Sequence, residues 1–128
     1  MGLTTAKANA VLDQLLGVAS IGATATVYVA AYNGDPASTG VESETAGTDG
    51  YARVALTAAA ASGGSSSNSV AINFGTNSGV GAWAITHYAL MSAATAGTRL
   101  WSGALTNATV ATNEDYEIAI GGLVFTVT

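Results

Sequence analysis

The chain has 128 residues, a formal net charge of −5 and only 9% charged residues, against about 25% in an ordinary soluble domain. This length suits one domain with a two-layer core. Lys7, Arg53 and Arg99 are the only basic residues, and so few scattered cations cannot form a nucleic-acid groove or a patch for an anionic membrane. The sequence has no cysteine, which excludes disulfides, catalytic thiols and thiolate metal ligands.

The scarcity of charge predicts self-association. The surface must be built largely from Ser, Thr, Asn, Gly and Ala, and strand edges without lysine are poorly protected from pairing with another copy. We therefore expect a homo-oligomer, with a trimer favoured. The N-terminal residues lack the regions of a signal peptide, and no apolar run is long enough to span a membrane, so we expect synthesis in the cytosol and no membrane partner.

Residues 4–16 have the pattern of an amphipathic helix. Thr4 or Thr5 can cap its start with a side-chain hydroxyl, and Gly17 can end it in a left-handed conformation. At helical spacing, one face carries Ala8, Val11, Leu12, Leu15 and Leu16. Because an isolated helix of this length is marginal in water, we expect the three leucines to be buried, either against the chain's own sheet or against a neighbouring subunit.

From about residue 24 the periodicity changes to that of β-strands. Runs of β-branched and aromatic residues predict strands at residues 26–32, 51–56, 69–74, 83–91, 98–105, 116–120 and 123–127. Polar or Gly-rich segments between them predict loops, chief among them residues 37–50, 58–68 and 107–113. Val70, Ile72 and Phe74 alternate with polar or small residues, so we expect all three on one buried face.

One helix followed by about seven short strands predicts a mainly β fold, because the strands do not alternate with helices. The expected architecture is an antiparallel β-sandwich, jelly-roll-like, with one N-terminal α-helix. In this prediction residues 1–22 form a helical docking arm and residues 23–128 form the β-sandwich domain of what is overall a single-domain chain.

No sequence pattern predicts catalysis. His87 is the only histidine, and no G-x-S-x-G or H-E-x-x-H motif accompanies it. A general base or a metal ligand is the alternative to the preferred interpretation, which is a strand histidine packed beside Trp83 and Ile85. We therefore predict that the protein is not an enzyme and that it has no catalytic residue, no cofactor and no metal site.

Three other groups of residues have a structural interpretation as well as a functional one. The acidic residues at 35–49 and 114–117 lack the spacing of a calcium loop and are interpreted as solvated charges. The glycine-rich run 75–81 lacks the lysine of a phosphate-binding loop and is interpreted as a turn. Four aromatic residues could line a carbohydrate-binding face but are more often core or interface anchors: Trp83, Tyr88, Trp101 and Tyr116.

Motifs spread over nearly the whole chain carry a family resemblance. They begin with Leu3-Thr4-Thr5-Ala6-Lys7-Ala8-Asn9, Leu15-Leu16-Gly17 and Thr26-Val27-Tyr28-Val29-Ala30, followed by an Asp35-Pro36 loop and Gly50-Tyr51-Ala52-Arg53. Further on come Ile72-Asn73-Phe74, Trp83-Ala84-Ile85-Thr86-His87-Tyr88-Ala89-Leu90 and Leu100-Trp101-Ser102-Gly103-Ala104-Leu105. In this order and spacing the chain resembles a family of small bacteriophage virion proteins that are usually labelled phage tail fibre proteins. The resemblance implies a structural part of the virion, made in the host cytoplasm, and no catalytic motif.

Two positions in the particle fit such a protein. One is that of a capsid decoration or cement protein, which binds the major capsid protein or other virion proteins in many copies on the head exterior. The alternative is a small tail-fibre or tail-tip component that contacts a host receptor. A fibre usually needs a shaft of repeats or heptads, which this sequence lacks, so decoration is the preferred hypothesis.

The expected assembly interface consists of Leu12, Leu15, Leu16 and Trp101. Interfaces have an apolar and aromatic centre with a polar rim, and these residues are the best candidates for such a centre. In the decoration hypothesis the neutral segment 75–81 joins this surface, and the acidic segment 35–49 faces solvent.

Overall fold

The computed structural model describes residues 2–22 and 26–127. Within these ranges the chain forms ten short strands and one helix. The elements are β1 (Gly2–Leu3), α1 (Thr5–Leu15), β2 (Tyr28–Asn33), β3 (Val41–Glu42), β4 (Val54–Ala55), β5 (Ser65–Ser67), β6 (Ile72–Thr76), β7 (Trp83–Met91), β8 (Arg99–Val110), β9 (Asp115–Ile118) and β10 (Val124–Thr126). The predicted fold class is confirmed, because the protein is mainly β and sandwich-like, with antiparallel sheets and one helix near the N-terminus.

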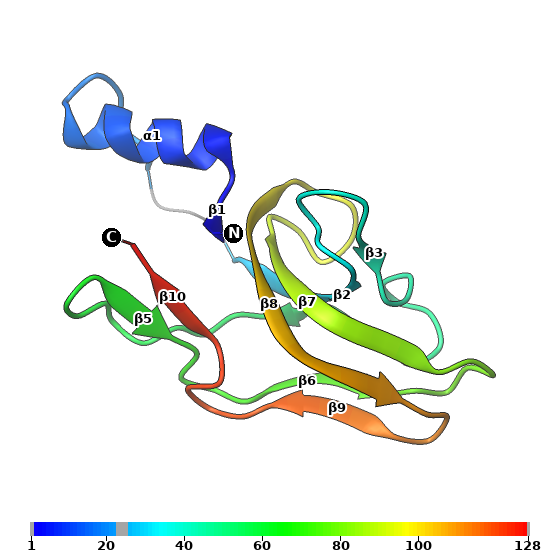
Figure 1. Cartoon of the computed structure of the whole chain (residues 1–128). Coiled ribbons are helices and arrows are strands. Elements are labelled where there is room, and N and C mark those ends of the chain that lie inside the picture. Colours follow the sequence, from blue (N-terminus) through cyan, green and yellow to red (C-terminus); the bar gives the residue numbers. More distant parts are fainter. Residues whose placement is uncertain (1, 23–25, 128) are drawn as a thin grey trace.

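The largest sheet has the strand order β1-β8-β7-β2-β3, and β4 also pairs with β2. Its centre is the long hairpin of β7 and β8, in which Trp83 lies opposite Val110 and Met91 lies opposite Arg99. Two ribbons, β10-β5 and β6-β9, make up the rest of the β-structure. In Figure 1 the β6-β9 ribbon lies below the large sheet and the β10-β5 ribbon lies to its left; these two ribbons form the second layer.

The hydrophobic core lies between these two layers. From β7 come Trp83 and Ile85, and from β6 come Ile72 and Phe74, each exposed by 1% or less. Tyr51 completes the cluster, because its ring stacks on Phe74 at a centroid distance of 5.9 Å and meets Trp83 edge-on at 5.7 Å. Offset and edge-on contacts are the arrangements that aromatic rings favour, so the predicted alternation in these two strands does build the core.

Two buried asparagines hold the turns of the second layer. The Asn68 side chain donates to the carbonyls of Val70 and Ala119, at 3.0 and 2.9 Å, and accepts the N–H of Leu123 at 2.9 Å. Asn77 has the same role in the 77–82 loop, where it donates to the carbonyls of Gly81 and Val110. Buried polar groups are almost always paired in this way, and these bonds give the turn backbone partners that no strand provides.

Glu42 and Arg53 form a largely buried ion pair that joins three segments. Arg53 donates from Nη2 and Nε to the two carboxylate oxygens of Glu42, at 2.7 and 2.9 Å, and the side chains are only 6% and 16% exposed. Arg53 Nη1 donates to the carbonyls of Ala93 and Ala96 at the tip of the β7-β8 hairpin. The hydrogen bond to Glu42 raises the pKa of Arg53. The interpretation of the whole 35–49 acidic group as solvated is therefore wrong for Glu42.

Tyr51 extends this network into the core. Its hydroxyl donates to Glu42 Oε1 at 2.8 Å and accepts the N–H of Ala31, on β2, at 2.9 Å. Burial, and after it the charge of Glu42, raises the pKa of Tyr51 far above its ordinary value. The ring thus belongs to the core while its hydroxyl ties β2 to the ion pair.

Three unpredicted strands explain why the described residues form ten strands and not about seven. β1 precedes the helix, β3 lies within residues 37–50, and β5 lies within residues 58–68. In addition, β8 continues through Val110 into the predicted 107–113 loop. The Ser-rich β5 has no apolar pattern and depends on pairing with β10, a partner remote in the sequence, so local propensity could not reveal it. Val70 was expected to be buried but is 54% exposed, because β6 begins only at Ile72.

Candidate assembly interface

The α1 helix begins and ends where the sequence predicts. Thr4 is the N-cap, in an extended conformation, and its hydroxyl accepts the N–H of Lys7 at 3.4 Å. Gly17 follows the C-cap with a φ of +73°, a left-handed conformation in which glycine carries no steric penalty. The cap residues are therefore sufficient to define this element locally.

The apolar face of α1 is not covered by the rest of the chain. Leu12, Leu15 and Leu16 are 53%, 77% and 71% exposed, and no residue of the helix is fully buried. Of the two predicted alternatives, the structure therefore excludes packing of these leucines against the chain's own sheet. Figure 1 shows the reason, because α1 projects beyond the end of the sheets instead of lying on a face of them. Burial against a neighbouring subunit stays a prediction.

The helix is held in the sheet by the strand that precedes it. β1 pairs with β8, with Gly2 opposite Ser102 and Leu3 opposite Trp101. The N–H of Thr4 then donates to the carbonyl of Leu100 at 3.0 Å. The segment proposed as a docking arm thus includes a strand of the largest sheet, and α1 is part of the connection between β1 and β2.

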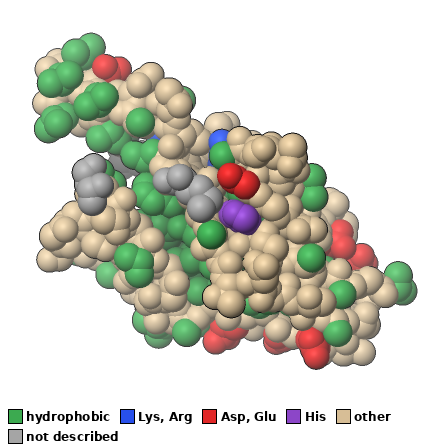
Figure 2. All heavy atoms as spheres, in the orientation of Figure 1, with side chains coloured by type: hydrophobic (Ala, Val, Ile, Leu, Met, Phe, Trp, Pro, Cys, Tyr) green, Lys and Arg blue, Asp and Glu red, His purple; other side chains and the backbone are tan. Residues whose placement is uncertain are grey.

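An apolar groove of about 230 Å³ lies at the base of the helix. Its lining combines residues of the N-terminal segment with residues of three strands and their approaches: Leu3, Lys7, Val11, Ile21, Val27, Leu90, Leu100 and Trp101. In Figure 2 hydrophobic side chains cover the projecting helix and continue as a band toward the body of the protein. The helix face and this groove together form the main apolar feature of the surface in that view.

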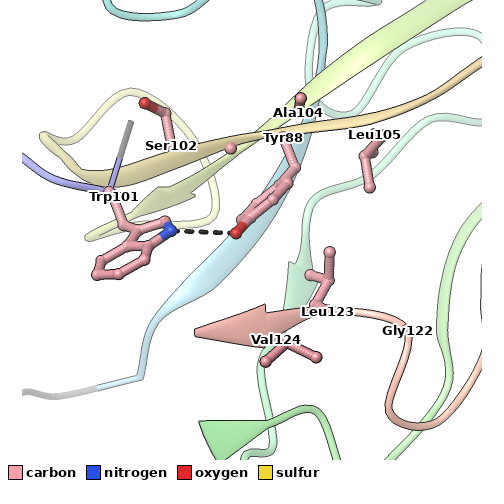
Figure 3. Close-up of a pocket in the computed structure, with 10 residues that line it drawn as sticks. Tyr88, Trp101, Ser102, Ala104, Leu105, Gly122, Leu123 and Val124 are labelled. Carbon is pink, nitrogen blue, oxygen red and sulfur yellow. Dashed lines mark hydrogen bonds between the residues drawn. The ribbon is translucent and has the colours of Figure 1, made fainter. Parts of the chain in front are cut away.

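Trp101 is a fixed anchor at one end of this groove. Its indole Nε1 donates to the Tyr88 hydroxyl at 3.0 Å, as Figure 3 shows. Its ring meets Phe125 edge-on at a centroid distance of 5.9 Å. Burial raises the pKa of Tyr88, and the hydrogen bond from Trp101 opposes that shift. Trp101 lines the groove together with Val11, but Leu15 and Leu16 lie outside the lining, so the four predicted interface residues do not form one cluster in a single chain.

Gly103 is a contributor that the sequence analysis did not identify. It lies two residues after Trp101 on β8 and faces the Tyr88 ring so closely that an added Cβ would lie 2.4 Å from Cε1 of that ring. A glycine inside a strand often marks such a close approach. This absence of a side chain is what lets Tyr88 lie flat enough against β8 to receive the indole hydrogen bond.

Trp83, Tyr88 and His87, three other residues considered for a binding or catalytic role, lie within the strands of the large sheet or pack in the core. Trp83 and Tyr88 are 1% and 5% exposed, so they are core residues, as the preferred interpretation expects. His87 is half-buried on β7, with Nδ1 2.8 Å from the hydroxyl of Thr86. In residues 2–22 and 26–127, no group of His, Asp and Glu side chains is placed to hold a metal ion. Within the same ranges, no helix is long and apolar enough to cross a membrane.

The fold and this surface define a small β-rich structural domain whose apolar exposure gathers on a projecting helix. The sequence model of one protein family, described as Podophage GP4 fiber I protein gp80, matches residues 2–126. The chain therefore belongs to this family, which confirms the resemblance to phage fibre-type virion proteins. A search of curated proteins finds no match. Membership makes a bacteriophage virion structural protein the class of this chain, and the family description names a fibre and no reaction.

Proposed function

We propose that this virion structural protein assembles through the apolar face of α1 and that other copies of the same chain cover that face. The observation that carries the proposal is the exposure of Leu12, Leu15 and Leu16 on a helix that leaves the sheet. Apolar surface gains roughly 25 cal/mol for each Å² removed from water, and a contiguous exposed patch of this kind marks an interaction site.

Self-association is supported by what one copy offers. Each chain has both an apolar helix face and an apolar groove at the base of that helix, so a head-to-tail contact between two copies can use unlike surfaces. Such a contact closes into a ring when the rotation between copies permits. The only charged residues of α1 are Lys7 and Asp13, which leaves little electrostatic opposition. A trimer is the favoured oligomer.

The proposed place in the particle is that of a fibre, in keeping with the family description. Capsid decoration is the second candidate, because the chain has no shaft repeat and a compact domain with one projecting helix also suits binding to a head lattice. The two positions differ in what the protein does. A fibre contacts the host, whereas a cement protein stabilises the lattice because it binds the assembled form and not the dissociated one.

The assembly proposal is tested with Leu15→Asp in the full chain. Because Leu15 is 77% exposed, the variant should fold with unchanged circular dichroism, but light scattering should show a monomer where the wild type is an oligomer. Ile120→Asp is the matched control, because Ile120 is 69% exposed and lies between β9 and β10, outside the proposed interface, and it should leave the oligomer intact. A wild-type monomer at high concentration, or an unchanged Leu15→Asp oligomer, contradicts the proposal.

The position in the particle is tested with virions that lack the protein. The fibre proposal predicts normal retention of DNA on heating or on chelation of divalent ions, together with reduced adsorption to host cells. Earlier release of DNA with unchanged adsorption would instead identify a cement protein on the head.

A further inference from the structure

A polar cavity of about 360 Å³ lies where α1 begins. Its lining comes from the N-terminal segment, the 35–40 loop and β8: Gly2, Leu3, Thr4, Thr5, Ala37, Arg99 and Ser102. It shares only Leu3 with the lining of the apolar groove. The cavity is therefore a second feature at the base of the helix, with a different chemistry.

Arg99 gives this cavity a positive charge that no described residue neutralises. Nη1 donates to the carbonyl of Pro36, while Nε is buried and has no hydrogen-bond partner among the described residues. Among the described residues the only ion pair is that of Arg53 with Glu42, so no described carboxylate pairs with Arg99. A guanidinium is a fork of several donors suited to carboxylate and phosphate oxygens.

The first turn of α1 adds unpaired backbone donors. Thr4 accepts from Lys7 through its hydroxyl and from Ala8 through its carbonyl, but the N–H groups of Thr5 and Ala6 have no acceptor within a helix. The first turn contains no acidic residue, so nothing on the helix balances the positive end of its dipole. Such a terminus favours an anion when other groups complete the site.

Two side chains of the lining point to a ligand. Ser102 is 3% exposed and lines the cavity, and no described residue forms a hydrogen bond with its hydroxyl. The buried Nε of Arg99 also lacks a partner among the described residues, although buried polar atoms are normally paired. Figure 3 shows that Ser102 lies on the opposite side of β8 from the Trp101 indole. In the β7-β8 pairing, Ser102 lies opposite Ala89 and Arg99 lies opposite Met91. Because Ala89 and Met91 belong to one buried cluster, Ser102 and Arg99 share a face of the sheet.

We propose that this cavity binds a small oxyanion, a carboxylate or a phosphate group. Arg99 provides the charge, the Thr5 and Ala6 amides provide the helix-terminal donors, and the Ser102 hydroxyl provides a further donor. The proposal does not depend on assembly through α1, because none of the exposed leucines lines this cavity.

The test is an NMR titration of the isotopically labelled full chain with sodium acetate and, separately, with sodium phosphate, each compared with sodium chloride at equal ionic strength. Saturable shifts of the Thr5 and Ala6 amides and of the Arg99 side chain are expected. Arg99→Gln should weaken binding by about tenfold or more, and Ser102→Ala by a few-fold, as expected for hydrogen bonds to a charged group. Lys7→Gln is the matched control, because it also removes one positive charge, but from α1 at a residue that does not line the cavity. The affinity of this variant for the anion should change less than about twofold.

Thr5→Pro keeps the proposal testable if Arg99→Gln does not fold. Proline is well tolerated at the first helical position and removes only the N–H there, and Thr4 already has the extended conformation that precedes proline. The variant should keep its helix by circular dichroism and bind the anion more weakly. Saturation by acetate alone identifies a carboxylate site, and saturation by phosphate alone identifies a phosphate site. Absence of saturable shifts, or equal weakening by Arg99→Gln and Lys7→Gln, overturns the proposal.

Discussion

Replacing Arg53 by methionine tests how the ion pair holds the fold. The change keeps much of the side-chain volume but leaves the Glu42 carboxylate and the carbonyls of Ala93 and Ala96 without their donor. Because the two charged side chains are 6% and 16% exposed, water cannot fully replace the lost bonds. Removing one member of a buried pair costs about 3–5 kcal/mol. A domain of this kind has about 5–15 kcal/mol in total, so Arg53→Met should be folded but marginal.

The assay is urea unfolding followed by tryptophan fluorescence, in which the buried Trp83 reports loss of the core. The control is the double variant Glu42→Met with Arg53→Met, which removes both charges and should be more stable than Arg53→Met alone, since it leaves no unpaired buried charge. The reasoning is refuted if Arg53→Met lies within about 1 kcal/mol of the wild type, the value of a solvent-exposed pair. It is also refuted if the double variant is no more stable than the single one.

Three further changes probe the candidate site and the core. Gly103→Ala should cost about 1–3 kcal/mol, because its Cβ would displace the Tyr88 ring, and the loss of the indole hydrogen bond should appear in near-ultraviolet circular dichroism; an unchanged spectrum would contradict it. The pKa of Tyr51 is raised in the folded state, so above about pH 10 the folded state keeps this proton while the unfolded state ionises. The contribution of Tyr51 to stability should therefore be constant below about pH 10 and fall above it by about 1.4 kcal/mol per pH unit. A stability that stays constant in urea titrations at alkaline pH would exclude this. His87→Gln should leave assembly unchanged in light scattering, and a loss of stoichiometric zinc in that variant would show a metal role instead.

The sequence determined the parts of the fold that depend on local pattern. Thr4 and Gly17 mark the start and the end of the helix, as predicted, and β7 begins and ends at the residues expected from its alternation. The pairings that lack a local signal were missed, since Ser65–Ser67 becomes a strand only through β10. Glu42 gave no sign of burial either, because its partner Arg53 lies beyond a loop and the two meet only when β3 and β4 both pair with β2. At the candidate site, the apolar helix face was predictable from spacing, but its exposure was not, because exposure depends on where the sheet ends.

The topology explains why the described part of the chain leaves the apolar face of α1 uncovered. In the strand order β1-β8-β7-β2, the end of β1 and the start of β2 lie at the same end of the sheet, with only two strands between them. Crossing three strand spacings requires about 14 Å, whereas an eleven-residue helix alone is about 16 Å long. The connection therefore has more chain than the crossing requires, and the excess forms a helix that projects past the sheet (Figure 1). A connection that served only the fold could be shorter and polar, so the exposed leucines are a feature that the fold does not require and that the proposed assembly through α1 would use.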